Sequence, residues 1–260
     1  MSPANWRVVV LAAGRGPNDP MAKAFGVAHK CTIPVAGVPM LARVIGALRA
    51  AKVAMPILVS IDSPDAGWQA LGGEQTDVRM VQSLDSAPAS AKHTVLEAQH
   101  FPVLITTGDH ALLTQEIVRD FLQRSENSDA DFIAGLATAE VILKGYPETK
   151  RTFFRLGPDR VSGCNLFAVM NDNGLKILDV WQHLERNRKK PWKLVAAFGL
   201  KPLWLFATGQ LNLERAFTLL STKLNSKIRA ALLPNPEAAI DIDKPSDHAL
   251  AEKILLERME

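Results

Sequence analysis

A short glycine loop near the start of the sequence has residue types that could bind phosphate. The apolar segment Val8–Ala13 runs directly into Gly14-Arg15-Gly16. Two glycines separated by one residue let the backbone approach a ligand closely, and successive backbone N–H groups in such a loop can bind an anion. The loop is not a dinucleotide fingerprint, because Asp19 stands where the third glycine would be, nor a P-loop, because no Gly-Lys-Ser/Thr follows. On its own, it fits phosphate binding and an ordinary strand-to-helix turn equally well.

Carboxylates follow two apolar segments and could hold a metal ion. Asp109 comes directly after the segment Val103–Gly108, and Asp241 and Asp243 alternate with isoleucines further along the chain. In a parallel α/β sheet, an acid after a strand lies at the rim where ligands bind, and two acids two residues apart share one face of an extended chain. Carboxylate and phosphate oxygens are the ligands that Mg²⁺ prefers. The alternative for each acid is a structural role at a turn or a helix start.

Basic residues in one loop could bind the phosphate of a second substrate. The segment 144–152 contains Lys150 and Arg151 together with a glycine and a proline. Such a loop could clamp a phosphate group, or it could simply be solvated. A second basic run, Glu185–Trp192, could touch an anionic membrane surface. Because cations are also stabilised at the end of a helix by its dipole, we favour that interpretation for the second run.

Apolar runs and helical patterns alternate along the chain, and these elements must position the candidate residues. Short continuous apolar runs are typical of strands buried on both faces of a parallel sheet. The expected strands are Arg7–Leu11, Met55–Ile61, Val78–Gln82, Val103–Thr107, Phe132–Leu136, Val161–Val169 and Ile240–Asp243. The expected helices are Met40–Ala51, Thr94–His100, Gln115–Ser125, Gly174–Arg188, Leu213–Ser221 and Pro245–Arg258. We therefore predict an α/β fold in three layers, with a mixed, mostly parallel sheet covered by helices on both faces.

The composition excludes several classes of protein. Of the 260 residues, 47% are hydrophobic and 22% charged, which excludes disorder as the main state. No apolar run reaches the ~18 residues of a membrane-spanning helix, and we interpret residues 8–13 as a buried strand rather than a signal peptide. A net charge of +3 is too small to indicate nucleic-acid binding. Cys31 and Cys164 lack metal-binding spacing and fit a reducing cytoplasm, although one disulfide between them stays open.

Three segments together carry a more specific pattern. Leu11–Gly16 reads Leu-Ala-Ala-Gly-Arg-Gly, Lys30 is followed by an apolar stretch and Gly37-Val38-Pro39, and Asp241–Asp247 begins Asp-Ile-Asp. This resembles the nucleotidyltransferases of the GT-A type, whose pattern is LAAGxGxR, a short loop, a lysine, an apolar stretch, GxP and a closing D-x-D-T-P-E-D-L. The superfamily includes the molybdenum-cofactor guanylyltransferase, the isoprenoid-pathway cytidylyltransferase and the sugar-1-phosphate nucleotidyltransferases. The resemblance extends over most of the chain.

The resemblance implies a GT-A-like, Rossmann-like nucleotide-binding fold and a Mg²⁺-dependent enzyme. The implied reaction joins the NMP of an NTP to a small phosphorylated acceptor, such as a sugar phosphate, a polyol phosphate or a molybdopterin-like compound, and releases pyrophosphate. The implied catalytic residues are Lys30 and Asp109, and the implied metal ligands are Asp109, Asp241 and Asp243. The implied nucleotide-binding residues are Leu11, Ala12, Ala13, Gly14, Arg15, Gly16, Lys30, Ser90, Thr94 and Gly108, and the implied acceptor-binding residues are Lys150, Arg151 and Asn165. Ser90 and Thr94 could instead belong to a plain helix cap, and Asn165 to a turn.

Two departures from the pattern leave choices open. Asn18 stands where the superfamily has an arginine, and the loop before Lys30 is longer than usual, so Lys23 competes with Lys30 for the phosphate-binding position. We favour Lys30, because its distance to the Gly-x-Pro segment is right. We favour Asp241 over Asp243 as the metal ligand, because Asp243 is close enough to the expected last helix to bind its backbone N–H groups.

Two other functions remain as alternatives. Asp241-Ile242-Asp243 is formally a DxD sequence, so a GT-A glycosyltransferase with a nucleotide-sugar donor is the first. A nucleotide-binding module without catalytic activity is the second, because the usual arginine is missing. We expect one domain over residues 1–260, with a nucleotide-binding part over about 1–139, an acceptor-side subregion over about 140–235, and a closing strand and helix over 236–260. The sequence predicts neither the base nor the oligomeric state.

Overall fold

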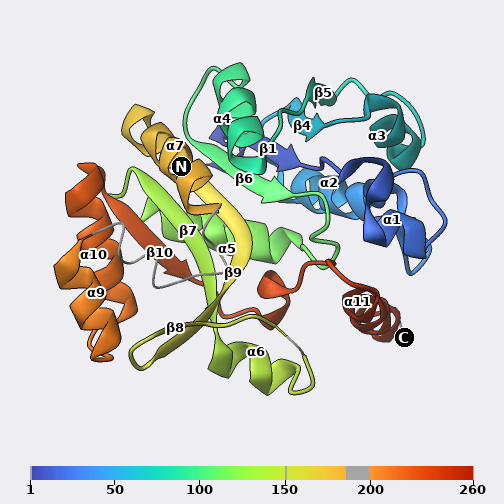
Figure 1. Cartoon of the computed structure of the whole chain (residues 1–260). Coiled ribbons are helices and arrows are strands. Elements are labelled where there is room, and N and C mark those ends of the chain that lie inside the picture. Colours follow the sequence, from blue (N-terminus) through green and yellow to red (C-terminus); the bar gives the residue numbers. More distant parts are fainter. Residues whose placement is uncertain (1, 150, 186–198, 260) are drawn as a thin grey trace.

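The computed structural model of the chain describes residues 2–149, 151–185 and 199–259. Within these residues, one mixed sheet of eight strands has the order β10-β7-β9-β6-β1-β4-β5, with β8 paired to β9 (Figure 1). The strands are β1 (Arg7–Leu11), β4 (Ile57–Ile61), β5 (Val78–Gln82), β6 (Val103–Thr107), β7 (Phe132–Thr138), β8 (Phe154–Leu156), β9 (Asp159–Val169) and β10 (Ile228–Leu232). Strand β9 is antiparallel to its neighbours β6, β7 and β8, and the other described pairs of this sheet are parallel. The predicted mixed, mostly parallel sheet is confirmed.

Helices cover both faces of the sheet, as predicted. One buried cluster joins α2, α3, α5 and α6 to one face, and another joins α4, α7 and α10 to the other. The helices are α1 (Pro20–Ala24), α2 (Met40–Ala51), α3 (Pro64–Leu71), α4 (Ala87–Glu97), α5 (Gln115–Glu126), α6 (Ala139–Gly145), α7 (Asp172–Glu185), α9 (Leu200–Ala207), α10 (Leu213–Leu224) and α11 (Pro245–Glu257). A small hairpin, β2 (Pro34–Val35) with β3 (Val38–Pro39), lies outside the sheet.

The central strand β1 shows why the N-terminal apolar run folds as a strand. Val8 and Val10 pack into the cluster with α2 and α5, whereas Val9 packs into the cluster with α4 and α7. Alternate side chains of a strand point to opposite faces, so a strand between two helical layers must be apolar at every position. Full burial of each valine contributes about 1.5–3 kcal/mol relative to exposure. Strand β1 thereby lies in the interior of the sheet, between β6 and β4, and the glycine loop begins after its carboxyl end.

A third buried cluster lies beside the sheet and fixes the segment that carries the late acids. Ile240 and Ile242 are almost completely buried against α11, against Met21 of α1 and against Ile33. Because these isoleucines alternate with Asp241 and Asp243, burial of one set turns the two carboxylates to the opposite side. The segment ends where α11 begins, and the Asp247 carboxylate accepts hydrogen bonds from the backbone N–H groups of residues 243 and 244.

Several predicted boundaries were wrong. Residues 240–243 do not form a strand, because the short 3₁₀ turn Pro236–Ala239 and helix α11 flank them closely. Helix α4 begins at Ala87 rather than Thr94, because the Ser86 hydroxyl caps it. The predicted end of the helix over 174–188 and the basic run after residue 185 lie outside the described residues. The pattern also missed β8, β10, α1, α3, α6 and α9, which are short or lie in the apolar stretch 194–231.

The two cysteines lie in the interior of the protein. Cys31 and Cys164 are both buried and free, and burial raises the pKa of the Cys31 thiol to about 12.

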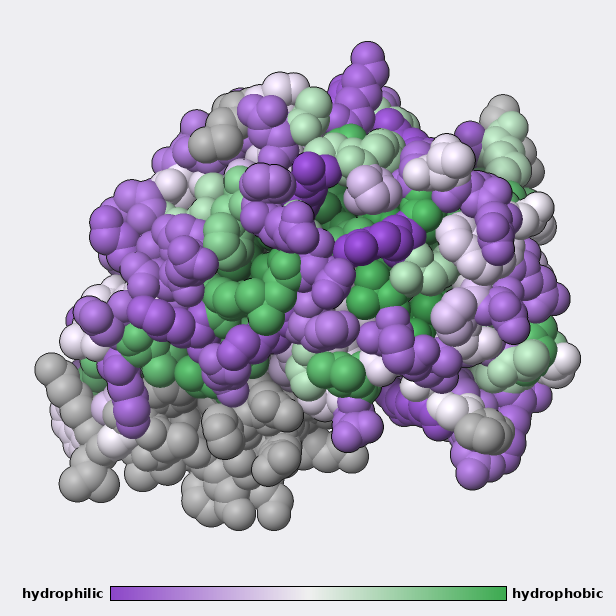
Figure 2. Space-filling model, turned by 90° about the horizontal axis from the view of Figure 1, so that it is seen from above, coloured by the Kyte–Doolittle hydropathy of each residue, from purple (hydrophilic) through white to green (hydrophobic). Residues whose placement is uncertain are grey.

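None of the described helices has the length and apolar character of a transmembrane span. Seen from above, hydrophobic residues lie mainly towards the middle of the face and hydrophilic residues around them (Figure 2).

Candidate functional site

An open cleft of about 720 Å³ lies at the carboxyl ends of β1 and β6. This is the edge where parallel α/β sheets bind ligands. Its lining comes from distant parts of the sequence and includes Leu11, Ala12, Ala13, Gly14, Arg15, Lys30, Gly108, Asp109, Asn165, Asp241 and Asp243, whereas Gly16 does not line it. Leu84, Asp85, Ser86 and Ser90 line a second side, and Phe154, Phe167 and Trp181 a third. The predicted candidates from the first half of the chain and from its C-terminal segment therefore meet in one cavity.

Asp109 sits where the end of β6 passes close to β1. The Gly108 N–H donates to the Leu11 carbonyl oxygen at 2.8 Å, and a Cβ atom on Gly108 would lie 2.9 Å from the Ala12 Cβ. A side chain at position 108 would therefore push the strand end away. From the other direction, the Ile242 N–H donates to the Asp109 carbonyl oxygen at 3.1 Å. These two backbone bonds fix Asp109 between the glycine loop and the late acids.

Lys30 is the cation of the cluster. Its Nζ lies 2.6 Å from Asp109 Oδ2 and 3.4 Å from Asp243 Oδ1. Burial alone would lower the pKa of Lys30, but the charges of Asp109 and Asp243 outweigh burial and raise it. Burial would likewise raise the pKa of Asp109, and the charge and hydrogen bond of Lys30 lower it instead. Both groups are therefore ionised near neutral pH.

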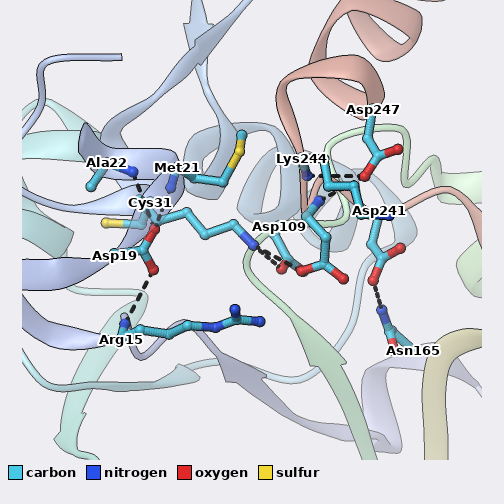
Figure 3. Close-up of polar contacts among 12 residues, drawn as sticks. Arg15, Asp19, Met21, Ala22, Cys31, Asp109, Asn165, Asp241, Lys244 and Asp247 are labelled. Carbon is cyan, nitrogen blue, oxygen red and sulfur yellow. Dashed lines mark hydrogen bonds and ion pairs between the residues drawn. The ribbon is translucent and has the colours of Figure 1, made fainter. Parts of the chain in front are cut away.

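The competing lysine is directed elsewhere. Lys23 Nζ donates to Asn18 Oδ1 at 2.7 Å, and both residues are exposed. Asn18 therefore pairs with Lys23, whereas Lys30 lies among the carboxylates. In Figure 3 the side chain of Arg15 extends from the glycine loop towards Asp109, so a guanidinium group reaches this side of the cleft although position 18 is not arginine.

The late acids complete a cluster of three carboxylates. One oxygen each of Asp109, Asp241 and Asp243 lie within 4.8 Å of one another. Asp241 bonds to Arg151 through one oxygen, and its other oxygen accepts from Asn165 Nδ2 at 2.8 Å (Figure 3). Burial and the nearby Asp109 charge raise the pKa of Asp241, while Arg151 opposes the rise. We expected Asp243 to bind backbone N–H groups at the start of α11. Its carboxylate instead accepts from Lys30, and the Asp247 carboxylate accepts from the N–H groups of residues 243 and 244 just before the helix.

The cluster fits a hard divalent cation. Its donors are carboxylate oxygens, which Mg²⁺ favours. Asp109 Oδ1 is buried without a hydrogen-bond partner, an arrangement that costs free energy unless another group satisfies it. Three carboxylates face the single ammonium group of Lys30, with Arg151 behind Asp241. An ion bound here would satisfy the Asp109 oxygen that lacks a hydrogen-bond partner.

The glycine loop is braced by two aspartates that the sequence pattern did not single out. The Gly14 N–H donates to Asp62 Oδ1 at 2.8 Å, and the Arg15 N–H donates to Asp19 Oδ2 at 3.2 Å. His29 Nε2 also lies 3.0 Å from Asp62 Oδ1. A signal was available, because Asp62 directly follows the buried strand β4. Two of the N–H groups expected to cradle phosphate are therefore already bonded.

The remaining predicted residues differ in whether they line the cleft. Ser90 lines the cleft, but its hydroxyl bonds to the backbone N–H and carbonyl of Leu84. Thr94 is completely buried in α4 and does not line the cleft. Asp85, which the sequence reasoning missed, exposes a carboxylate in the cleft. Lys150 lies outside the described residues.

Comparison with known proteins decides the family. The MobA-like NTP transferase domain matches residues 8–152, which is more than half of the chain. The chain belongs to the MobA-like NTP transferase family. The resemblance to nucleotidyltransferases read from the sequence is thus confirmed, and the family is one of enzymes. No curated protein sequence matches this MobA-like transferase.

Solved structures share the fold over nearly the whole length of this MobA-like transferase. A hypothetical transferase from Thermus thermophilus is 26% identical, with a TM-score of 0.77, and the match covers 94% of this chain and 99% of the other. A CMP-2-keto-3-deoxy-manno-octonic acid synthetase in complex with CTP is 14% identical, with a TM-score of 0.59 and coverage of 98% and 99%. A 4-diphosphocytidyl-2C-methyl-D-erythritol synthase from Anaerococcus prevotii is 13% identical, with a TM-score of 0.56 and the same coverage. The last two show the likeness of fold alone.

Proposed function

We propose that this MobA-like transferase is a Mg²⁺-dependent nucleotidyltransferase that joins the NMP of an NTP to a small phosphorylated acceptor and releases pyrophosphate. The observation that carries the proposal is the cluster of Lys30 and three carboxylates beside the glycine loop, all within one cleft. The family and the CTP complex of a structural neighbour support an NTP as the donor.

The reaction requires positioning and charge compensation more than acid–base catalysis. An oxygen of the acceptor phosphate forms a bond to the α-phosphorus, and the bond from that phosphorus to the bridging oxygen of the β-phosphate breaks. The acceptor oxygen is already ionised, and pyrophosphate leaves with the bond electrons, so no side chain has to remove a proton. Enzymes can accelerate such transfers by holding the reactants together and by stabilising the charge that develops.

Lys30 has the position and the charge for that stabilisation. An ammonium group has three donors, and Asp109 and Asp243 accept two of them. The remaining donor is available for an oxygen of the α-phosphate. The raised pKa keeps Lys30 protonated throughout the neutral range. Arg15 and the unbonded N–H groups of the glycine loop would bind the β- and γ-phosphates.

Asp109, Asp241 and Asp243 would hold the metal ion. Bound there, Mg²⁺ would neutralise charge on the α-phosphate and orient it towards the acceptor. Asp109 contributes an oxygen without another partner, and the bonds to Arg151 and Asn165 hold the Asp241 carboxylate in place. Because all three residues are carboxylates, their charges suit a triphosphate bound together with a cation and not a triphosphate alone.

The aromatic side of the cleft suits the organic part of the acceptor. Phe167 and Trp181 have ring centroids 4.9 Å apart, and Phe154 from β8 is 47% exposed beside them. We propose that the acceptor lies against these rings, which come from the acceptor-side subregion of about 140–235, and that residues 1–260 act as a single domain. The free, buried thiols of Cys31 and Cys164 support a cytoplasmic location.

Pyrophosphate release tests the proposal. The four common NTPs are combined with a library of phosphate monoesters in Mg²⁺ buffer, and pyrophosphate is measured with a coupled enzyme assay. We expect release that requires NTP, acceptor and Mg²⁺ together. Asp109→Asn should abolish the release, and Asp65→Asn, which changes an acid on α3 away from the cleft, should preserve it. Equal activity of Asp109→Asn and the wild type would contradict the proposed metal site.

A further inference from the structure

The backbone of Asn165 departs from the extended conformation of a strand. It lies inside β9 and has a φ of 50°, whereas the other described non-glycine residues with positive φ lie outside strands. The left-handed region is unfavourable for residues other than glycine, and strain of this kind is often found at functional sites. The pairing of β9 with β7 also shifts in register between Ala134 and Leu136, close to this point. The strand is therefore distorted where Asn165 leaves it.

The distortion directs the Asn165 amide to Asp241. Asn165 Nδ2 donates to Asp241 Oδ2 at 2.8 Å, as Figure 3 shows. Arg151 bonds to the other carboxylate oxygen through Nη2, and its Nη1 donates to the Asp241 carbonyl oxygen at 3.2 Å. Both oxygens of Asp241 are thus held by hydrogen bonds. The side chains of Arg151 and Asp241 are 13% and 14% exposed, so little water competes with these bonds.

We propose that Arg151 and Asn165 are positioning residues that hold the Asp241 carboxylate where it can share a divalent cation with Asp109. The inference rests on the metal site of the proposed function. The carboxylate oxygens lie within 4.8 Å of one another, and an ion with ligand bonds of about 2.1 Å spans such a gap after a small rotation of the side chains. Without Arg151 and Asn165, repulsion from Asp109 would turn Asp241 away.

The donor atoms of the two residues favour this role over contact with the acceptor. The Arg151 nitrogens Nη1 and Nη2 are both used by Asp241, and Arg151 does not line the cleft. Asn165 lines the cleft, but its amide nitrogen is directed to the carboxylate.

Mn²⁺ binding without nucleotide tests the proposal directly. Free Mn²⁺ is measured by electron paramagnetic resonance during titration of the wild type, Asp109→Asn, Arg151→Met and Asn165→Gly. Loss of residues that orient metal ligands typically weakens metal affinity by about 10–100-fold, and we expect a weakening of that size for Arg151→Met and Asn165→Gly. In the turnover assay, both variants should need more Mg²⁺ while the acceptor KM at saturating Mg²⁺ stays unchanged.

Two matched variants separate positioning from general damage. Arg155→Met removes an exposed arginine from the neighbouring β8, and Asn225→Gly changes an asparagine with a φ of 47° at the end of α10. Both should bind Mn²⁺ like the wild type. Because glycine adopts positive φ without strain, Asn165→Gly should lose mainly the stability of its hydrogen bond to Asp241. A Tm well above the assay temperature would show that its weaker Mn²⁺ binding does not reflect unfolding. This variant also keeps the test decisive if Arg151→Met fails to fold.

Asn165→Asp distinguishes a positioning residue from a direct ligand. A carboxylate at this position would repel Asp241, so positioning predicts weaker Mn²⁺ binding, whereas tighter binding would overturn the proposal by making residue 165 a ligand. If Asp109→Asn loses Mn²⁺ but Arg151→Met and Asn165→Gly bind it normally, the positioning role is wrong and the metal site stands. If the wild type binds no Mn²⁺, the metal site of the proposed function is wrong as well.

Discussion

Lys30 has a different environment from the other basic residues near the glycine loop. It is largely buried between Asp109 and Asp243, and the distance to Asp109 is that of a short, charge-assisted hydrogen bond. Lys23 instead extends to Asn18 at the surface. A lysine that stays charged beside several carboxylates can still offer its third N–H donor to a phosphate oxygen. The two lysines therefore serve as a matched pair for mutation.

Lys30→Ala should lower the rate of turnover far more than Lys23→Ala. Loss of one group that stabilises charge in the transition state typically costs about 10²–10³ in rate, and Lys30 is proposed to have this role. Lys23 bonds only to an exposed asparagine, so its removal should change the rate little. Steady-state pyrophosphate release measures both variants. A larger loss in Lys23→Ala than in Lys30→Ala would show that Lys23 binds the α-phosphate.

Asp243→Asn should leave the stability of the protein nearly unchanged and should raise the Mg²⁺ concentration required for turnover. The Asp243 side chain is 50% exposed, and its Oδ1 lies 3.4 Å from Lys30 Nζ. An ion pair in which one side chain is half exposed contributes less than about 1 kcal/mol to the free energy of unfolding. Thermal unfolding and a Mg²⁺ titration of activity measure the two effects. A drop in Tm of many degrees with an unchanged Mg²⁺ requirement would contradict this assignment.

At the level of residues, the sequence predicted those candidates that lie within a recognisable motif of adjacent residues. Lys30, Asp109, Asp241 and Asp243 were all named, and they lie together in the structure. The preference for Asp241 over Asp243 relied on a helix cap that Asp247 provides instead. The Asp62 carboxylate that braces Gly14 was missed, because it lies outside the motifs that carried the resemblance.

Three strands of the sheet are tied together at one end by a single carboxylate. Asp131, just before β7, accepts from Asn171 Nδ2 after β9 at 2.8 Å and from the Lys227 N–H before β10 at 2.7 Å. The Ser226 hydroxyl also donates to it. Burial would raise the pKa of Asp131, but the hydrogen bonds from Asn171, Lys227 and Ser226 lower it. Asp131 in its ionised form therefore connects β7, β9 and β10.

Asp131→Asn should destabilise the protein by about 2 kcal/mol at neutral pH, since hydrogen bonds to a charged group contribute about 1.5–3 kcal/mol. Because the folded-state pKa lies below the unfolded value, this stability is present above about pH 5 and is lost as pH falls through the folded-state pKa. Urea unfolding at pH 7 and pH 3 measures the difference. Asp129→Asn, an exposed neighbour, is the control and should change little. An equal deficit of Asp131→Asn at both pH values would contradict the role of the charge.

At the level of elements, strands with continuous apolar runs were predictable and short or irregular elements were not. The expected strand Arg7–Leu11 matches β1, because burial on both faces demands an uninterrupted apolar run. The expected strand Ile240–Asp243 has the alternation of a strand but no partner strand, so contacts beyond the segment decide its form. Alternation predicted the directions of its side chains correctly even so, because burial of Ile240 and Ile242 decides them.

The cleft as a whole depends on contacts between distant parts of the chain. Arg151 and Asp241 are separated by 90 positions, and Lys30 and Asp243 by 213. The sequence placed these residues in one site only through the resemblance to a family, because no local pattern connects them. The fold brings the glycine loop, the acids and the aromatic side together at one edge of the sheet. This arrangement supports transfer between two bound phosphates.

The fate of the phosphorus atoms tests the proposed transfer most directly. NTP labelled with ³²P at the α-position or at the γ-position is incubated with Mg²⁺ and an acceptor that is active in pyrophosphate release, and the products are separated. Nucleotidyl transfer predicts that the α-label appears in the acceptor product and the γ-label in pyrophosphate, and that Asp109→Asn loses both. Appearance of the γ-label on the acceptor would contradict nucleotidyl transfer and show phosphoryl transfer in its place.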